Sequence, residues 1–166
     1  MSAQLQAVLQ APRREAMGLA DLDEVLLIEN AVYEFPWTRG NFIDSLAAGY
    51  AAQVLRDDGG LLCAYSVAMP GVQEVHLLNL TVAPAMQHRG LARGLLDALV
   101  AQARAGDALC LWLEVRESNE HARAIYRRYG FLQVGSRRGY YPAAAGARED
   151  ACVMRLALDG RPDALD

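Results

Sequence analysis

The chain has 166 residues, of which 53% are apolar, and a net charge of −4 at pH 7, which suits a single domain and argues against a nucleic-acid-binding protein with its usual basic stripe. No apolar run reaches the length of about 20 residues that a membrane-spanning helix needs. The first 16 residues lack the basic start and apolar stretch of a secretion signal, so we expect a cytoplasmic protein.

The first half of the chain reads as two helices followed by a strand meander. Apolar residues at helical spacing indicate the first helix, and Phe35-Pro36-Trp37 ends it. Thr38 is placed to cap the second helix. The Asp-Asp-Gly-Gly segment at 57–60 is typical of a hairpin turn. The expected elements are helices at 21–33 and 38–48 and strands at 51–55, 61–69 and 74–82.

The second half alternates helices and strands. The run at 109–115 is nearly all apolar, as a strand buried on both faces would be, and Gly130 is well placed to end a helix. The order predicts an α/β fold whose mixed sheet has helices on both faces. We expect an N-terminal extension at 1–12, one domain at 13–158 and a C-terminal tail at 159–166. The expected elements are helices at 91–105 and 119–129 and strands at 109–115, 131–138 and 151–158.

A loop between strand and helix, Gln-His-Arg-Gly-Leu-Ala at 87–92, could bind phosphate. A helix start offers unpaired N–H groups and partial positive charge, and Gly90 lets the backbone approach such a ligand. Arg89 and Arg93 could add charge-assisted contacts. Taken alone, the segment also fits an ordinary strand-to-helix turn. Neither a P-loop motif nor a dinucleotide-binding G-x-G-x-x-G motif is present.

Three further segments, at 77–84, 113–119 and 124–131, together with this loop resemble the acetyl-CoA-binding motifs of the GNAT acetyltransferase superfamily. Their V-x-P, Q-x-x-G-x-A and N…Y-x-x-x-G-F patterns occur in that order. The resemblance implies a GNAT fold: a mostly antiparallel sheet, splayed between its fourth and fifth strands. Those strands would be 74–82 and 109–115.

The chain resembles one family more closely, the bacterial ribosomal-protein-alanine N-acetyltransferases of the RimI type. Four segments carry this resemblance: F-P-W-T at 35–38, L-W-L-E-V-R-E-S-N at 111–119, R-R-G-Y-Y-P at 137–142 and R-E-D-A at 148–151. It covers about residues 17–158, and Ala92 stands where the family often has Gly. The implied partners are acetyl-CoA and the N-terminal peptide of a small-subunit ribosomal protein.

The family resemblance also assigns cofactor contacts. The backbone of the strand before the loop would bind the pantetheine arm and polarise the thioester carbonyl, while N–H groups of the loop would hold the diphosphate. The implied cofactor-binding residues are Leu80, Thr81, Val82, His88, Arg89, Gly90, Leu91, Ala92, Arg93 and Asn119.

Glu114 and Tyr126 match the family's general base and general acid. Glu114 is the one acid in an apolar strand, where burial would raise its pKa and make it a better base near neutral pH. It could instead reach solvent or pair with Arg116. Tyr126 would protonate the leaving thiolate, or be a helix-face aromatic of the core. We expect Tyr129, on the next part of the helix, to be structural.

The acceptor side is less defined by the sequence. Pro36 and Trp37 would shape the segment after the first helix, and Tyr140 and Tyr141 would lie on the loop between the last two strands, facing the acceptor peptide. All four could equally just pack. The alternative acceptors are a small-molecule amine or other protein amines, and a non-catalytic acetyl-CoA-binding module is a further alternative.

Cysteines and histidines give no sign of a metal site. Cys63, Cys110 and Cys152 lie far apart in apolar runs without C-x-x-C spacing, which predicts buried, inert thiols. The three histidines, at positions 76, 88 and 121, are scattered along the chain. We therefore expect no metal.

Overall fold

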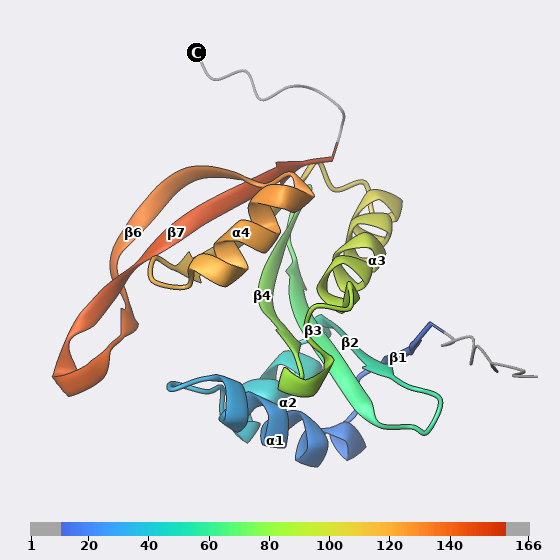
Figure 1. Ribbon diagram of the computed structural model, residues 1–166. Coiled ribbons are helices and arrows are strands. Elements are labelled where there is room, and N and C mark those ends of the chain that lie inside the picture. Colours follow the sequence, from blue (N-terminus) through green and yellow to red (C-terminus); the bar gives the residue numbers. More distant parts are fainter. Residues whose placement is uncertain (1–10, 159–166) are drawn as a thin grey trace, which may run out of the picture.

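The computed structural model describes residues 11–158. Within these residues, seven strands form one sheet in the order β1-β2-β3-β4-β5-β7-β6 (Figure 1). The strands are β1 Arg13–Ala16, β2 Ala51–Arg56, β3 Leu62–Pro70, β4 Glu74–Val82, β5 Cys110–Arg116, β6 Leu132–Pro142 and β7 Arg148–Ala157. The helices are α1 Leu22–Val32, α2 Arg39–Ala47, α3 Leu91–Ala105 and α4 Glu120–Tyr129.

The sheet opens between β4 and β5, its one parallel pair. Pairing runs only from Glu74 opposite Cys110 to Leu77 opposite Leu113. At the next residue of β4 the register with β3 also shifts, because Ala68 pairs with Leu77 and Val67 with Asn79. This bulge adds one residue, Leu78, to β4. The side chains after it therefore point to the face opposite to the one that simple alternation along the strand predicts. The splay expected between the fourth and fifth strands is confirmed.

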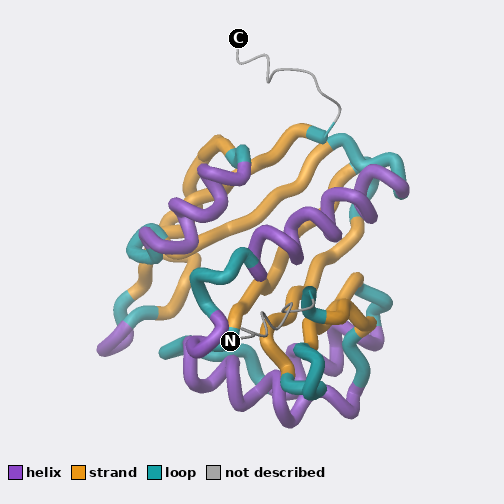
Figure 2. The backbone as a smooth tube through the Cα atoms, turned by 45° about the vertical axis from the view of Figure 1, so that its right-hand side comes forward, coloured by secondary structure: helices purple, strands orange, loops and turns teal. Residues whose placement is uncertain are grey.

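Helices cover both faces of the sheet, which confirms the predicted fold class (Figure 2). On one face α1 and α2 pack against β2 and β3 around Tyr65 and Phe42. On the other, α3 and α4 pack against β4, β5 and β7 around Leu96, Leu111 and Met154. No helix within residues 11–158 is long and apolar enough to cross a membrane.

The structure differs from the sequence-based prediction at both edges of the sheet. β1 was not predicted, because its four residues are all exposed and carry no apolar alternation. β6 continues through Pro142, so Tyr140 and Tyr141 lie in a strand and not on the predicted loop. All but Ala11 and Pro12 of the expected extension at 1–12, and the whole tail at 159–166, fall outside the described residues. The three cysteines are buried and free, as predicted.

Candidate active site

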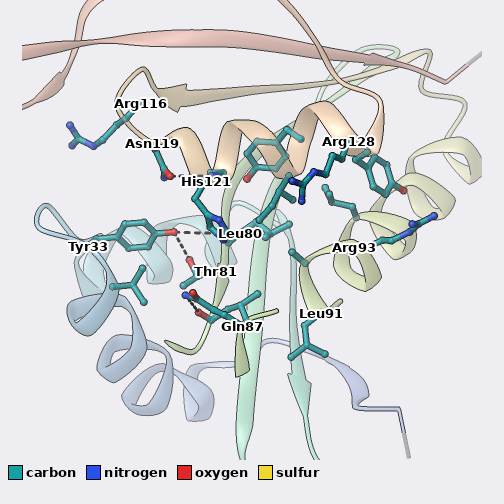
Figure 3. Close-up of a pocket in the computed structure, with 18 of the residues that line it drawn as sticks. Tyr33, Leu80, Thr81, Gln87, Leu91, Arg93, Arg116, Asn119, His121 and Arg128 are labelled. Carbon is teal, nitrogen blue, oxygen red and sulfur yellow. Dashed lines mark hydrogen bonds between the residues drawn. The ribbon is translucent and has the colours of Figure 1, made fainter. Parts of the chain in front are cut away.

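A cavity of about 1200 Å³ occupies the gap where β4 and β5 separate (Figure 3). Its walls come from β4, from the length of α3 and α4, and from the end of α1. Nine of the ten predicted cofactor residues line it; Arg89 does not. The nine are Leu80, Thr81, Val82, His88, Gly90, Leu91, Ala92, Arg93 and Asn119. Beyond Leu77 the edge of β4 that faces β5 has lost its strand partner, so an extended ligand could pair with its backbone.

The loop before α3 has the shape of an anion site. Gly90 is the N-cap of α3 at φ 78° and His88 has φ 62°, so two residues of this short loop are left-handed. A backbone that alternates between right-handed and left-handed residues turns successive N–H groups toward a common point. The first N–H groups of α3 add to them, since they have no partner within the helix. The loop can therefore hold a diphosphate, as its sequence suggested.

Two histidine rings contact each other at the wall of the cavity. The ring centroids of His88, in the loop, and His121, in the first turn of α4, lie 5.5 Å apart, and both rings line the wall. Because 33 positions separate them along the chain, they were expected to lie apart. No group of three or more potential metal ligands occurs within residues 11–158. The pair instead links the two helix starts beside the proposed diphosphate position.

A buried polar chain connects α1 to β4. Tyr33 shares a hydrogen bond of 2.8 Å with the Thr81 hydroxyl, which donates to Asn79 Oδ1 at 2.7 Å. The Asn79 amide in turn donates to Glu29, a helix residue only 1% exposed. Burial and the charge of Glu29 raise the pKa of Tyr33 against the opposing effect of Thr81. Because the bulge turns Asn79 and Thr81 toward α1, this chain fixes the strand segment that borders the gap.

Glu29 and Tyr33 were not among the predicted functional residues. A signal existed for Glu29, which lies seven residues after Leu22 and four after Val25, on the same buried helix stripe. Its carboxylate accepts hydrogen bonds from the Trp37 N–H at 2.8 Å, from the Tyr65 hydroxyl and from Asn79. Three donors on two oxygens suit an ionised carboxylate, which only accepts.

Tyr126 is buried at the cavity wall, on the inner face of α4. Burial raises the pKa of its hydroxyl, and nearby Tyr33 and Tyr141 raise it further, so the phenol is protonated at neutral pH. Its hydroxyl has no hydrogen-bond partner within residues 11–158, which leaves the proton available. Tyr129, by contrast, donates to Asp97 at 2.7 Å and so ties α4 to α3.

Glu114 is not among the residues that line the cavity. Leu113 and Val115 point into the core beneath α3 and α4, so Glu114 between them points the other way. Its carboxylate is 18% exposed and lies 3.4 Å from the Arg137 guanidinium. It does not pair with Arg116, which binds Glu149 instead. Burial, then Tyr140, then Glu114 raise the pKa of Tyr141, which places Glu114 within electrostatic reach of that hydroxyl.

None of the four predicted acceptor residues lines the main cavity. Trp37 packs on Phe42 with ring centroids 5.2 Å apart and borders a second hollow of about 510 Å³, while Pro36 precedes it, half-buried. Tyr140 and Tyr141 contact each other at 4.9 Å. Phe35, which the prediction left out, does line the main cavity.

A splayed strand pair beside a helix start that can hold phosphate, with a tyrosine and a glutamate on opposite faces, defines a class: transferases that use an acyl-coenzyme A. Residues 22–131 match the acetyltransferase (GNAT) family.

Full-length relatives narrow the class. The chain is 36% identical to a ribosomal protein bS18-alanine N-acetyltransferase of Haemophilus ducreyi, over 83% of this chain and 94% of the relative. It is 36% identical to the enzyme of that name from Escherichia coli K12, over 86% and 95%. The crystal structure of the E. coli ribosomal-protein-S18-alanine N-acetyltransferase superposes with a TM-score of 0.80 at 32% identity, covering 93% of this chain and 98% of that one.

The chain therefore belongs to the GNAT acetyltransferases, within the family of ribosomal protein bS18-alanine N-acetyltransferases. It is an acetyl-CoA-dependent N-acetyltransferase, as the sequence resemblance implied.

Proposed function

We propose that this enzyme acetylates the α-amine of the N-terminal alanine of ribosomal protein bS18, by direct attack in a ternary complex with acetyl-CoA. The observation that supports the chemistry is the gap between β4 and β5, with Tyr126 at the cavity wall and Glu114 on the opposite face of β5. The relatives' names support the choice of acceptor. Such an enzyme would work in the cytoplasm, where ribosomal proteins are made.

The donor would lie along the free edge of β4. Backbone groups at Leu80, Thr81 and Val82 would pair with the pantetheine arm, and one N–H of that strand would polarise the thioester carbonyl. The diphosphate would rest on the N–H groups from His88 to Arg93, with Asn119 contacting the coenzyme from the start of α4.

The acceptor would enter between the segment after α1 and β6. Its amine nitrogen attacks the thioester carbon and gives up a proton to Glu114, directly or through water. An α-amine has a pKa near 8, so a useful fraction is neutral near pH 7 and the task of the base is mild. The tetrahedral intermediate then breaks its carbon–sulfur bond, and the leaving thiolate takes the proton of Tyr126.

The test is a purified-enzyme assay with three acceptors: a bS18 N-terminal peptide, the same peptide with its α-amine already acetylated, and free polyamine. We expect acetyl-CoA-dependent gain of one acetyl group on the first peptide alone, located at the N-terminus by fragment mass spectrometry. Faster acetylation of the polyamine, or of a side-chain amine in the blocked peptide, would refute the proposed acceptor.

A further inference from the structure

Arg116, the last residue of β5, contacts aromatic rings from two separate parts of the chain. Its guanidinium carbon lies 5.3 Å from the centroid of Phe35, in the segment after α1, and 4.6 Å from that of Tyr141, in β6. Both distances are within the range of a cation–π interaction. Figure 1 shows the segment after α1 and the β6–β7 hairpin on the same side of the molecule.

Polar contacts fix the same guanidinium. One nitrogen, Nη1, donates to the Pro142 carbonyl at 2.7 Å and lies 3.3 Å from the Glu149 carboxylate. Glu149 also accepts the Ser118 N–H at 2.9 Å, so the carboxylate is itself held in place. The Arg116 side chain is 25% exposed. An arginine held by a carbonyl, a carboxylate and two rings has little freedom to move.

The position of these contacts relates them to the acceptor path. Phe35 and Arg116 both line the main cavity (Figure 3 shows Arg116 at its rim). Tyr141 lies in β6, the strand that also carries Arg137, the partner of Glu114. In the proposed function, an acceptor whose amine reaches Glu114 would pass between the segment after α1 and β6, the two parts that Arg116 contacts.

We propose that Arg116 is a positioning residue that sets the mouth of the acceptor groove by holding Phe35 and Tyr141 at fixed places on its guanidinium. This inference rests on the proposed function. Arg116 acts through these two rings and not on the reacting atoms. Because Glu149 neutralises its charge, it presents a stacking surface more than a free cation to the incoming positive amine.

The geometry specifies arginine over lysine. A guanidinium is planar, stacks on aromatic rings and donates in several directions at once, whereas an ammonium keeps the charge but loses the flat face. Arg116→Lys should therefore keep the pairing with Glu149 and lose most of the ring contacts. Arg116→Gln loses both.

The experiment compares Arg116→Lys, Arg116→Gln and Phe35→Leu with the unmodified enzyme, using the bS18 peptide. We expect the peptide KM to rise about 10-fold in each variant, the size of effect expected for losing a partly buried cation–π contact. The kcat at saturating peptide and the Kd of acetyl-CoA from calorimetry should stay within about twofold. Arg127→Gln, which removes an exposed arginine of α4, is the matched control and should leave the peptide KM unchanged.

A double-mutant cycle isolates the contact. If Arg116 acts through Phe35, the combined Arg116→Gln, Phe35→Leu variant should raise the KM by clearly less than the product of the two single effects. Should Arg116→Gln fail to fold, Phe35→Leu alone must still show the KM rise, since Phe35 is 39% exposed and its loss leaves the core intact.

The outcomes separate the two claims. An unmodified enzyme that does not acetylate the peptide refutes the proposed function, and this inference with it. An active enzyme whose Arg116 and Phe35 variants keep the peptide KM overturns the inference alone. So does a variant that loses acetyl-CoA affinity in parallel with the KM change, since that pattern marks a general structural role.

Discussion

The Asn79 side chain donates a hydrogen bond of 3.2 Å to the carboxylate of Glu29, joining β4 to α1 inside the protein. The same carboxylate accepts the Trp37 N–H, so one buried residue fixes both the strand beside the proposed thioester and the segment proposed to face the acceptor.

Glu29→Gln should destabilise the fold. The amide places an N–H₂ group against partners that are themselves donors, which leaves buried polar groups unsatisfied at a cost of about 1–3 kcal/mol. Denaturant unfolding followed by circular dichroism measures the difference. Glu24→Gln is the control: Glu24 pairs with Arg56 at 3.0 Å but is 44% exposed, and its loss should cost about 0–1 kcal/mol. Equal effects from the two variants would contradict the role given to the buried carboxylate.

Gly90→Ala and Gly94→Ala form a matched pair in one helix. A Cβ would meet nothing within 4 Å at either position, so only backbone conformation distinguishes them. At φ 78° alanine should cost about 1 kcal/mol at position 90. In the body of α3 it should stabilise position 94 by about 0.5–1 kcal/mol. Thermal unfolding gives the order; acetyl-CoA should also bind more weakly to Gly90→Ala alone. Stabilisation by both substitutions would contradict the left-handed backbone conformation at position 90.

Tyr126→Phe should lower kcat about 100-fold, the effect of losing a general acid, with acetyl-CoA affinity kept. Tyr129→Phe is the control, since it removes the hydrogen bond to Asp97 and should cost about 1 kcal/mol of stability without a comparable loss of turnover. Steady-state kinetics at saturating substrates decides. Normal turnover in Tyr126→Phe would remove the assigned role.

His121→Ala should weaken acetyl-CoA binding about 5-fold, because it removes one ring of the pair beside the diphosphate loop and a hydrogen-bond donor from the cavity wall. Calorimetric titration measures the affinity. His76→Ala serves as the comparison, since that ring stacks on Trp112 and pairs with Glu74 without lining the cavity. Identical affinities for both variants would show that the histidine pair does not contact the coenzyme.

The lowered pKa of Glu149 predicts a pH-dependent contribution to the stability of the folded protein. Hydrogen bonds from Ser118, with Arg116 beside it, hold the pKa of Glu149 below its ordinary value of 4.5. A lowered folded-state pKa stabilises the protein above the unfolded value, and the benefit is lost as pH falls through the folded value. The melting temperature of Glu149→Gln should therefore lie below that of the unmodified protein at pH 7, and the gap should narrow below pH 4.5. A gap that stays constant down to pH 3 would exclude this linkage.

The central elements could be predicted because their sequence patterns are strong. The bounds of β4 and α3 agree with prediction, since Ala83-Pro84 and Gly106 mark where they end. The resemblance to the family's motifs predicted the splay between β4 and β5. Short or exposed elements carry no such pattern: β1 has four exposed residues, and the part of β6 beyond Arg138, which contains Gly139 and Pro142, was expected to be a loop.

Long-range pairing could not be read from the chain. Nothing local shows that Glu114 meets Arg137 instead of its neighbour Arg116, because that choice depends on how β7 pairs with both β5 and β6. The contact of His88 with His121 likewise depends on how the two helix starts converge. The bulge in β4 that turns Asn79 toward Glu29 depends on its register with β3.

The measurement closest to the central claim is the intact mass of bS18 from cells that carry this gene and from cells that lack it. We expect the N-terminal alanine to bear one acetyl group in the first and none in the second, with acetylation restored by the unmodified gene but not by a Tyr126→Phe copy. An acetylated bS18 that persists without the gene would contradict the claim that this enzyme modifies it.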